Sequence, residues 1–334
     1  MTNPIRLPER ARILIVRLRR LGDLLLLTPA LRAIRDTYPQ AQIDALVLDG
    51  FHHALLGNPR LDRVVVLKRG AAAWLAAINA CGRGRYDAVL DFQSSPRSLP
   101  FVLAAHAAVR VGWRKRGVRD WAYTHHAPGW DEPLYVARNF VRFASIIGVP
   151  TTSDLHLELT TVDADRQRAA AVFATAGIDR RRPVIALSVV SKVDRKRWAP
   201  ERYAELADGI ISAHDAQLVF TNGPGELDQV RAVIERMQRP PALWNFDSGT
   251  LAGLAAIYER CHLWIGNDGG AKHIATAAGC PTLVIIKAGD ERFWTDTSDT
   301  SQVAVCDREQ GSLDGIGAAQ VFEVAAAMIS RLRT

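Results

Sequence analysis

Two successive series of short apolar strands, each alternating with helical stretches, constrain the fold of this chain. The first series predicts a helix over residues 24–37 and strands at 12–16, 43–48, 64–67 and 88–92. The second predicts strands at 184–187, 218–221, 263–265 and 282–286, with helices over 201–213, 226–238, 251–260 and 271–278. Because strands that alternate with helices form parallel sheets covered on both faces, the pattern predicts an α/β protein with two doubly wound halves.

The length allows each half its own core, since 334 residues suit two domains of about 150 residues each. We place the boundary near residue 160. This gives domains 1–160 and 161–316, and a last helix within 317–334 that could pack back on the first domain. Ligands of open α/β sheets bind beyond the carboxyl ends of the strands. We therefore expect the two halves to face a central cleft lined by the loops that follow the strands.

Composition narrows the class of protein. Hydrophobic residues make up 48% and charged residues 23%, as in an ordinary globular protein. No apolar run approaches the roughly 20 residues needed to cross a bilayer, and the N-terminus lacks a secretory pattern. The four cysteines are scattered without a C-x-x-C pair, which indicates neither a zinc site nor a disulfide framework. We expect a cytoplasmic protein.

The formal charge of +7 comes largely from two local clusters of basic residues. The first, interleaved with Trp113 and Trp121, consists of Arg110, Arg114, Lys115, Arg116 and Arg119, and the second of Lys192, Arg195, Lys196 and Arg197. Local clusters fit phosphorylated ligands or an anionic membrane surface better than a long nucleic-acid duplex. The alternative is that both are solvated basic loops.

The most informative segment is an apolar strand that runs into Asp268-Gly269-Gly270 and then into an alanine-rich helix. The glycines leave the first helical turn without side chains, where backbone N–H groups and the helix dipole suit a phosphate oxygen. An ionised Asp268 would repel phosphate, so we expect it to hold the turn or to pair with a cation. The alternative is a tight turn with Asp268 as N-cap and with His273 as a packed histidine.

The loop after the first predicted strand ends in Gly22-Asp23, where a helix begins. Asp23 could take a proton from an alcohol as a general base, or it could cap the helix. This loop has one glycine where a dinucleotide fingerprint needs three, and no P-loop occurs in the chain. The dehydrogenase and P-loop classes are therefore disfavoured.

Two loops of the second half also carry polar groups. In the loop that begins at Ser188, Ser191 can donate hydrogen bonds and Lys196 can stabilise the negative charge that grows on a departing diphosphate. In the other, Glu226 begins a helix and could bind ribose hydroxyls or cap the helix. The chain has no Asp-x-Asp run that would hold a divalent cation against a diphosphate.

Four blocks together resemble glycosyltransferase family 9, the ADP-heptose:lipopolysaccharide heptosyltransferases. They are Gly22-Asp23 ahead of Thr28-Pro29-Ala30-Leu31, Tyr86-Asp87-Ala88-Val89-Leu90-Asp91-Phe92-Gln93, Lys196-Arg197-Trp198-Ala199-Pro200, and Asp268-Gly269-Gly270-Ala271-Lys272-His273-Ile274-Ala275. The resemblance covers almost the whole chain. It implies a GT-B fold of two Rossmann-like domains, with the acceptor on the first and the nucleotide sugar on the second. It also implies inversion at the anomeric carbon without a metal or other cofactor.

The resemblance also implies roles for individual residues. Asp23 matches the family's proposed base, Lys196 its phosphate-binding lysine, and Glu226 its ribose-binding glutamate. The complete set of candidates is catalytic Asp23 and Lys196; donor-binding Gly22, Ser188, Ser191, Lys192, Glu226, Asp268, Gly269, Gly270 and His273; and acceptor-binding Arg97, Arg114 and Lys115. No metal ligands are predicted.

Two departures from the family pattern lie near the expected donor. Many members have Asp-Thr-Gly where this chain has Asp268-Gly269-Gly270. Many also have a Gly-Pro pair where this chain reads Lys287-Ala288-Gly289-Asp290. The donor could therefore differ from ADP-heptose.

The sequence thus favours an inverting, metal-independent heptosyltransferase that acts on a phosphorylated glycolipid or saccharide at the cytoplasmic membrane face, as a monomer and without nucleic acid. One alternative is a related GT-B transferase with another nucleotide sugar or acceptor. The other is a non-catalytic protein that binds phosphate or nucleic acid. Asp23 discriminates between enzyme and binding protein, because a binding module needs no carboxylate in its cleft.

Overall fold

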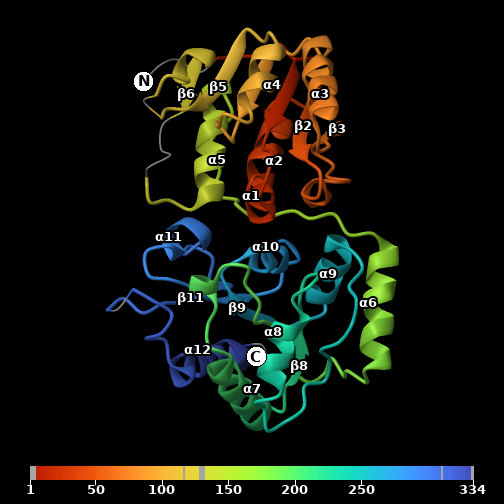
Figure 1. The fold of residues 1–334 in the computed structure, drawn as a ribbon, viewed down its shortest axis with the longest axis vertical. Coiled ribbons are helices and arrows are strands. Elements are labelled where there is room, and N and C mark those ends of the chain that lie inside the picture. The colour runs from red at the N-terminus through yellow and green to blue at the C-terminus, as the bar shows by residue number, and fades with distance from the viewer. Residues whose placement is uncertain (1–4, 116, 128–131, 310, 332–334) are drawn as a thin grey trace. The chain divides into compact units, whose positions relative to one another are not determined.

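The computed structural model describes residues 5–115, 117–127, 132–309 and 311–331 (Figure 1). The chain forms two compact units, Met1–Thr160 and Thr161–Thr334. Each unit contains one parallel sheet with helices packed on it. Within the described ranges, no helix is both long and apolar enough to cross a membrane.

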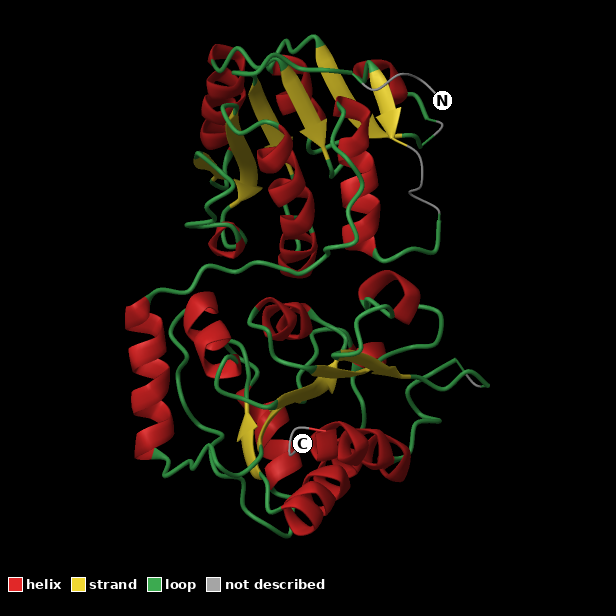
Figure 2. Ribbon diagram, turned by 180° about the vertical axis from the view of Figure 1, so that it is seen from behind, coloured by secondary structure: helices red, strands yellow, loops and turns green. Residues whose placement is uncertain are grey.

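The first unit has a six-stranded parallel sheet in the order β3-β2-β1-β4-β5-β6 (Figure 2). Its strands are β1 (Arg12–Val16), β2 (Gln42–Leu48), β3 (Arg63–Leu67), β4 (Ala88–Asp91), β5 (Val109–Trp113) and β6 (His125–Ala127). The sequence predicts the first four. It misses β5, in which Arg110 interrupts the apolar run, and β6, which has three residues, two of them histidines. Arg110, assigned above to a basic loop, lies within β5 and donates from Nε to the backbone oxygen of Ala122 at 2.7 Å.

Helices cover both faces of this sheet. They are α1 (Leu21–Leu26), α2 (Thr28–Thr37), α3 (Ala71–Arg83), α4 (Leu99–Ala104) and α5 (Val136–Ala144). The helices α2 and α5 pack side by side, as Figure 1 shows, and α3 packs on α4. The single helix predicted over 24–37 is two helices, because Leu27 separates α1 from α2 and Pro29 stands in the first turn of α2.

The second unit has a five-stranded parallel sheet in the order β11-β10-β9-β7-β8. Its strands are β7 (Val184–Ser188), β8 (Gln217–Phe220), β9 (Leu263–Asn267), β10 (Thr282–Ile285) and β11 (Gln302–Val305), of which the sequence misses only β11. Its helices are α6 (Asp163–Thr175), α7 (Pro200–His214), α8 (Leu227–Ile234), α9 (Leu251–Tyr258), α10 (Gly270–Ala277), α11 (Glu291–Trp294) and α12 (Ala318–Arg331).

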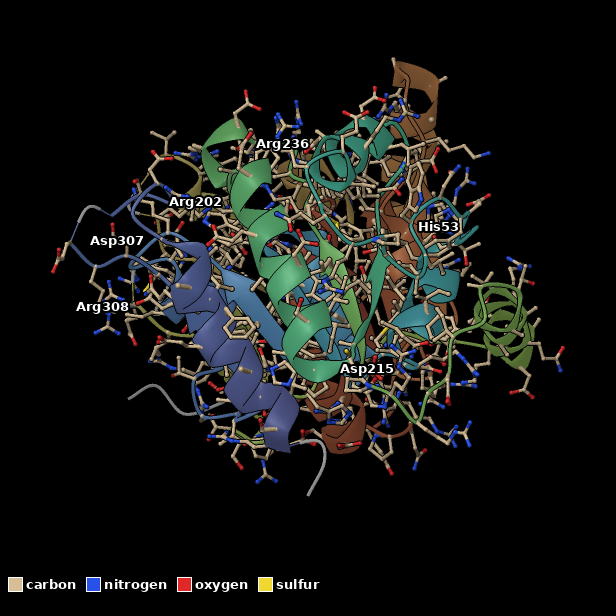
Figure 3. The ribbon with its side chains drawn as sticks, turned by 90° about the horizontal axis from the view of Figure 1, so that it is seen from below. His53, Arg202, Asp215, Arg236, Asp307 and Arg308 are labelled. Carbon is tan, nitrogen blue, oxygen red and sulfur yellow. The ribbon has the colours of Figure 1, made fainter. Side chains whose placement is uncertain are left out.

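The helix α12 packs on α7 and belongs to the second unit, rather than returning to the first as considered above. Figure 3 shows the two helices side by side, with Arg202 and Asp215 labelled on and after α7. Arg202 donates to the backbone oxygens of Leu313 and Ile316, at 3.2 and 2.7 Å, in the segment that leads into α12. These contacts and the buried side chains of α12 make the helix part of the second core.

Parallel strands place the loops that follow them at one edge of each sheet. In the first unit, the loops after the neighbouring strands β1 and β4 share an edge. In the second, the loops after β7, β9 and β10 do so. The candidate residues predicted to act on phosphates or on the acceptor hydroxyl lie in or just after such loops, apart from Ser188 at the end of β7 and His273 inside α10.

Candidate functional site

In the first unit, Asp23 is the third residue of α1, and its side chain is 7% exposed. Oδ2 of Asp23 lies 2.6 Å from Nη2 of Arg17. The cap position of α1 is Arg20, and no side chain caps the helix there. Asp23 is therefore not the N-cap that the alternative interpretation assigned, but one half of a buried ion pair. Gly22 lies beside it in the first unit, in the first turn of α1.

Arg17 is a site residue that the sequence did not single out. Its Nη1 donates to the backbone oxygen of Phe92 at 2.6 Å, and its guanidinium lies 5.4 Å from the centre of the Phe140 ring. The Phe92 oxygen and the Phe140 ring therefore hold the guanidinium, which in turn positions the Asp23 carboxylate. A pre-positioned carboxylate in a nearly dry environment can accept the proton of an alcohol.

The loop after β4 is organised by Asp91, which is completely buried. Its Oδ1 accepts from the backbone N–H groups of Gln93 and Ser94 at 3.0 and 2.9 Å, and the Tyr123 hydroxyl donates to Oδ2 at 2.7 Å. Burial raises the pKa of the Asp91 carboxyl, although these hydrogen bonds oppose the shift. Asp91 thereby fixes the loop that carries Arg97.

A cavity of about 250 Å³ opens in the first unit beside this loop. Its cationic lining is Arg19, Arg69 and Arg97, its apolar lining includes Leu18, Leu48 and Trp74, and Gln93 and Ser95 complete the polar part. Guanidinium groups recognise phosphates and carboxylates, and an aromatic ring offers a flat apolar surface. The cavity is thus suited to an anionic ligand with an apolar face.

Of the predicted acceptor residues, only Arg97 lines this cavity. Arg114 and Lys115 follow β5 and are exposed, and they are not among the lining residues. Arg116, the next member of that basic cluster, lies outside the described residues. The sequence predicts no role for Arg19 or Arg69, which come from the loops after β1 and β3 and belong to no motif.

In the second unit, Asn267 joins three segments at the carboxyl edge of the sheet. Its side chain accepts from the backbone N–H of Trp198 at 3.1 Å and donates to the backbone oxygen of Val189 at 2.9 Å. The loop that carries Lys196 is thereby held against the end of β9. Nζ of Lys196 contacts Oδ2 of Asp268 in an ion pair, which is the pairing with a cation considered above.

The helix α10 begins at Gly270, with Gly269 in the cap position and no side chain capping it. Asp268 is therefore not the N-cap, and its negative charge is balanced by Lys196. A helix N-terminus with uncapped N–H groups, beside a lysine, attracts a phosphate group. The ion pair removes the electrostatic objection to a carboxylate at this position.

Further into α10, His273 is buried against Trp294, with ring centres 6.3 Å apart. Burial lowers the pKa of His273 well below its ordinary value, and the charges of Lys272 and Lys196 lower it further. The ring is therefore neutral, and its position is that of the packed histidine considered above.

Lys272 is a second residue that the sequence did not single out. It is completely buried, and its Nζ donates to the backbone oxygen of Trp294 and to Oε1 of Gln302, the latter at 3.2 Å. Burial lowers its pKa to about 8, although Asp268, Asp296 and Asp299 oppose the shift. Lys272 ties α10 to the end of α11 and to the start of β11.

The remaining donor candidates have local partners. Ser188 is buried at the end of β7, and Lys192 is exposed. Oγ of Ser191 donates to the backbone oxygen of Val193 at 3.0 Å. Oε2 of Glu226 accepts from the N–H of Gly223 at 2.8 Å and so closes the turn before α8. Glu226 occupies the cap position of α8, but its side chain does not cap the helix, contrary to the capping alternative.

A small hollow adjoins the Lys196–Asp268 pair. Its lining comprises three cations, two carboxylates and an apolar wall: Arg195, Lys196, Lys287, Asp268, Asp290, Ile285, Ile286 and Leu313. Lys287 comes from the loop after β10, where the sequence departs from the family pattern. The hollow is a cationic site at the carboxyl edge of the second sheet.

Comparison with known proteins identifies the family of the chain. The sequence pattern of glycosyltransferase family 9 (heptosyltransferase) matches residues 74–314. The lipopolysaccharide core heptosyltransferase OpsX of Haemophilus influenzae is 26% identical over 80% of this chain and 77% of its own. The solved glycosyl transferase family 9 protein of Veillonella parvula superposes with a TM-score of 0.85 at 23% identity, over 96% of this chain and 97% of that one.

A solved E. coli heptosyltransferase, WaaC with ADP-2-deoxy-2-fluoro heptose, has the same fold, with a TM-score of 0.71 and 19% identity over 95% of this chain and 99% of that one. The two parallel sheets form the GT-B fold of these enzymes. The family match covers well over half of the chain. The chain therefore belongs to glycosyltransferase family 9 and is a glycosyltransferase of the heptosyltransferase type.

Proposed function

We propose that this enzyme transfers a heptose from ADP-heptose to an acceptor of the lipopolysaccharide-core type, with inversion and without a metal ion. The observation that carries the proposal is the uncapped N-terminus of α10 beside the Lys196–Asp268 ion pair. Such a site suits the diphosphate of a nucleotide sugar. The proposal is also supported by the names of the relatives, which are lipopolysaccharide heptosyltransferases.

In the proposed reaction, the oxygen of an acceptor hydroxyl attacks the anomeric carbon of the heptose. Its proton passes to the carboxylate of Asp23, which Arg17 holds in place. The bond between the anomeric carbon and the diphosphate oxygen breaks, and the electron pair stays on the diphosphate. Because attack and departure occur on opposite sides of the carbon, the configuration inverts.

The departing diphosphate gains negative charge as the bond breaks. Lys196 and the N–H groups of Gly269 and Gly270, at the start of α10, stabilise that negative charge. A fixed cation and fixed dipoles stabilise the transition state more than the ground state. No step of this scheme requires a divalent cation, and we expect activity to survive an excess of chelator.

For the acceptor, we propose the three-arginine cavity of the first unit, which fits a sugar bearing a phosphate or carboxylate. The basic cluster of the same unit would hold the enzyme at an anionic membrane surface. Val118 and Trp121, which are 90% and 70% exposed, lie among its cations. Tryptophan favours the membrane interface, and each basic residue near an anionic surface adds about 1 kcal/mol of attraction.

The test combines a donor panel with a variant of the base. Binding of ADP, UDP and GDP, and transfer from their heptose or hexose sugars, would be measured with wild type and with Asp23→Asn. Asparagine keeps an oxygen that Arg17 can bind but lacks the basic carboxylate, so we expect turnover to fall about 100-fold with little change in nucleotide affinity.

Three outcomes would contradict parts of this proposal. Preference for another nucleotide would favour the related transferase with a different donor. Unchanged turnover in Asp23→Asn would remove the proposed base. Activity lost to chelator and restored by magnesium or manganese would overturn the metal-independent scheme.

A further inference from the structure

We propose that Lys287 is a second cationic contact for the donor's diphosphate, and that it sets the preference of this enzyme for a diphosphate over a monophosphate. The inference rests on the proposed function for the identity of the ligand. It concerns a position where this chain departs from its family, so the family pattern does not supply it.

The sheet topology brings Lys287 to the phosphate-binding turn. The strand β10 pairs in parallel with β9, with Ile285 opposite Asn267. The residues that follow these two strands therefore leave the same edge side by side, with Lys287 beside the Asp268–Gly269 turn. Lys287, Lys196 and Asp268 line the same hollow.

The loop after β10 is a defined turn. The backbone N–H of Asp290 donates to the backbone oxygen of Lys287 at 3.1 Å. Gly289 has a φ of 90°, a left-handed conformation that favours glycine. The Cα of Lys287 is thereby held at the rim of the hollow while its exposed side chain can reach a ligand.

Lys287 and Lys196, the two lysines of the hollow, differ in how far their charge is already balanced by a carboxylate. Lys196 is paired with Asp268, so part of its charge is already balanced. Lys287 forms no ion pair with any described carboxylate. A diphosphate carries more negative charge than the N-terminus of α10 and one paired lysine can balance, which leaves a role for the other cations of the hollow, Arg195 and Lys287. A second phosphate group would therefore gain most from Lys287.

The experiment compares the full-length wild type, Lys287→Ala, Lys287→Arg and the control Arg239→Ala by calorimetric titration with ADP and with AMP. Arg239 is an exposed cation of the same unit that does not line the hollow, and its backbone N–H, rather than its side chain, donates to Asp208. Melting temperatures would confirm that all four proteins are folded.

We expect Lys287→Ala to weaken ADP binding about tenfold, since a charge-assisted hydrogen bond is lost, while AMP binding changes less than twofold. Lys287→Arg should keep most of the ADP preference, and Arg239→Ala should match wild type. Added salt should weaken ADP binding less steeply in Lys287→Ala than in wild type, because one exposed charge is gone.

Equal ADP affinity in Lys287→Ala and wild type would overturn the inference and leave the proposed function intact. An equal loss for ADP and AMP would also overturn it, because Lys287 would then not discriminate between them. If wild type prefers UDP or GDP, the same comparison with that diphosphate and its monophosphate decides the role of Lys287. Failure of wild type to bind any nucleoside diphosphate would overturn both proposals.

Discussion

Two glycines near the phosphate-binding turn have different physical reasons to be glycine. A Cβ on Gly266, in β9, would lie 2.4 Å from the backbone oxygen of Ser188 in the neighbouring strand β7. A Cβ on Gly269 would meet only the backbone oxygen of Asn267, at 4.0 Å. Gly269 has an extended φ of −177°, which any residue can adopt. The first glycine is required by packing, and the second leaves room for a side chain.

We therefore expect opposite results from two substitutions. Gly266→Ala should lower the free energy of unfolding by about 1–3 kcal/mol, because β7 and β9 must move apart. Gly269→Thr, which restores the residue common in the family, should leave the melting temperature nearly unchanged and alter donor affinity. Thermal melts and nucleotide titrations of both variants check this. A stable Gly266→Ala, or an unfolded Gly269→Thr, would contradict the packing argument.

Among the elements of the first unit, the segment before residue 160 is tied to the domain by a carboxylate. Glu158 accepts from Nη1 of Arg32, on α2, at 2.9 Å and from Nη2 of Arg60 at 3.2 Å. Burial alone would raise the pKa of Glu158, but the hydrogen bonds from Arg32 and Arg60 outweigh it, and the net pKa is lowered from 4.5. The segment is thereby held most firmly when Glu158 is ionised.

This shift predicts an acid-dependent loss of stability. A carboxyl whose pKa is lower in the folded state contributes stability that is fully present above its unfolded pKa, near 4.5, and is lost as the pH falls through the folded value. Wild type should therefore lose stability below about pH 4.5 more steeply than Glu158→Gln, which has no proton to gain. Melting temperatures between pH 3 and 7 would show it. Parallel pH profiles for the two proteins would contradict the role assigned to Glu158.

The strands of both sheets that the sequence predicts are those with long apolar runs. It misses β5, β6 and β11, because Arg110, His125 and Gln302 interrupt the apolar pattern or occupy a short strand. Their existence depends on pairing with a neighbouring strand, which local sequence does not encode. The split between α1 and α2 falls at Leu27, and Pro29 in the first turn of α2 is the residue of the sequence that signals it.

Prediction of the candidate site from the sequence has the same limit. Motifs identify Asp23, Lys196 and Asp268, because these residues stand in recognisable blocks. They do not identify Arg17 or Arg69, which come from positions without a motif and reach the site only through folding. They also give no role to Lys272, although it stands in the last of the four blocks. Sequence can thus name the reacting groups, whereas the groups that position them require the structure.

For the molecule as a whole, the basic cluster that follows β5 is the feature that would most affect binding to a membrane surface. Arg114 and Lys115 are exposed, and Val118 and Trp121 expose apolar side chains a few residues further on. Cations attract anionic lipids, and an exposed tryptophan inserts among the head groups. The two kinds of contact should respond differently to salt, because only the first is screened.

We expect Arg114→Gln with Lys115→Gln to weaken binding to vesicles that contain anionic lipid by about tenfold or more at low salt. Trp121→Ala should weaken binding at low and high salt alike. Neither variant should change nucleotide affinity, because all the residues proposed to hold the diphosphate are in the second unit.

Co-sedimentation with vesicles of neutral or mixed lipid would measure these effects. The double substitution Arg239→Gln with Arg308→Gln removes two exposed charges from the second unit and is the matched control. If the control weakens vesicle binding as much as the variant of the cluster, attraction comes from net charge alone and the cluster is a solvated loop.

The packing of α12 on α7 also sets the order in which the protein can fold as it is made. Val321, Ala325 and Ile329 of α12 complete the core of the second unit, yet the ribosome makes them after every strand of both sheets. At about 5–20 residues per second, the 174 residues of that unit take about 10–35 s to synthesise. During that time the first unit can already be folded, while the apolar face of the second sheet that α12 helps to cover stays exposed. Chaperones that shield such a face would therefore meet this protein late in its synthesis, on its second half.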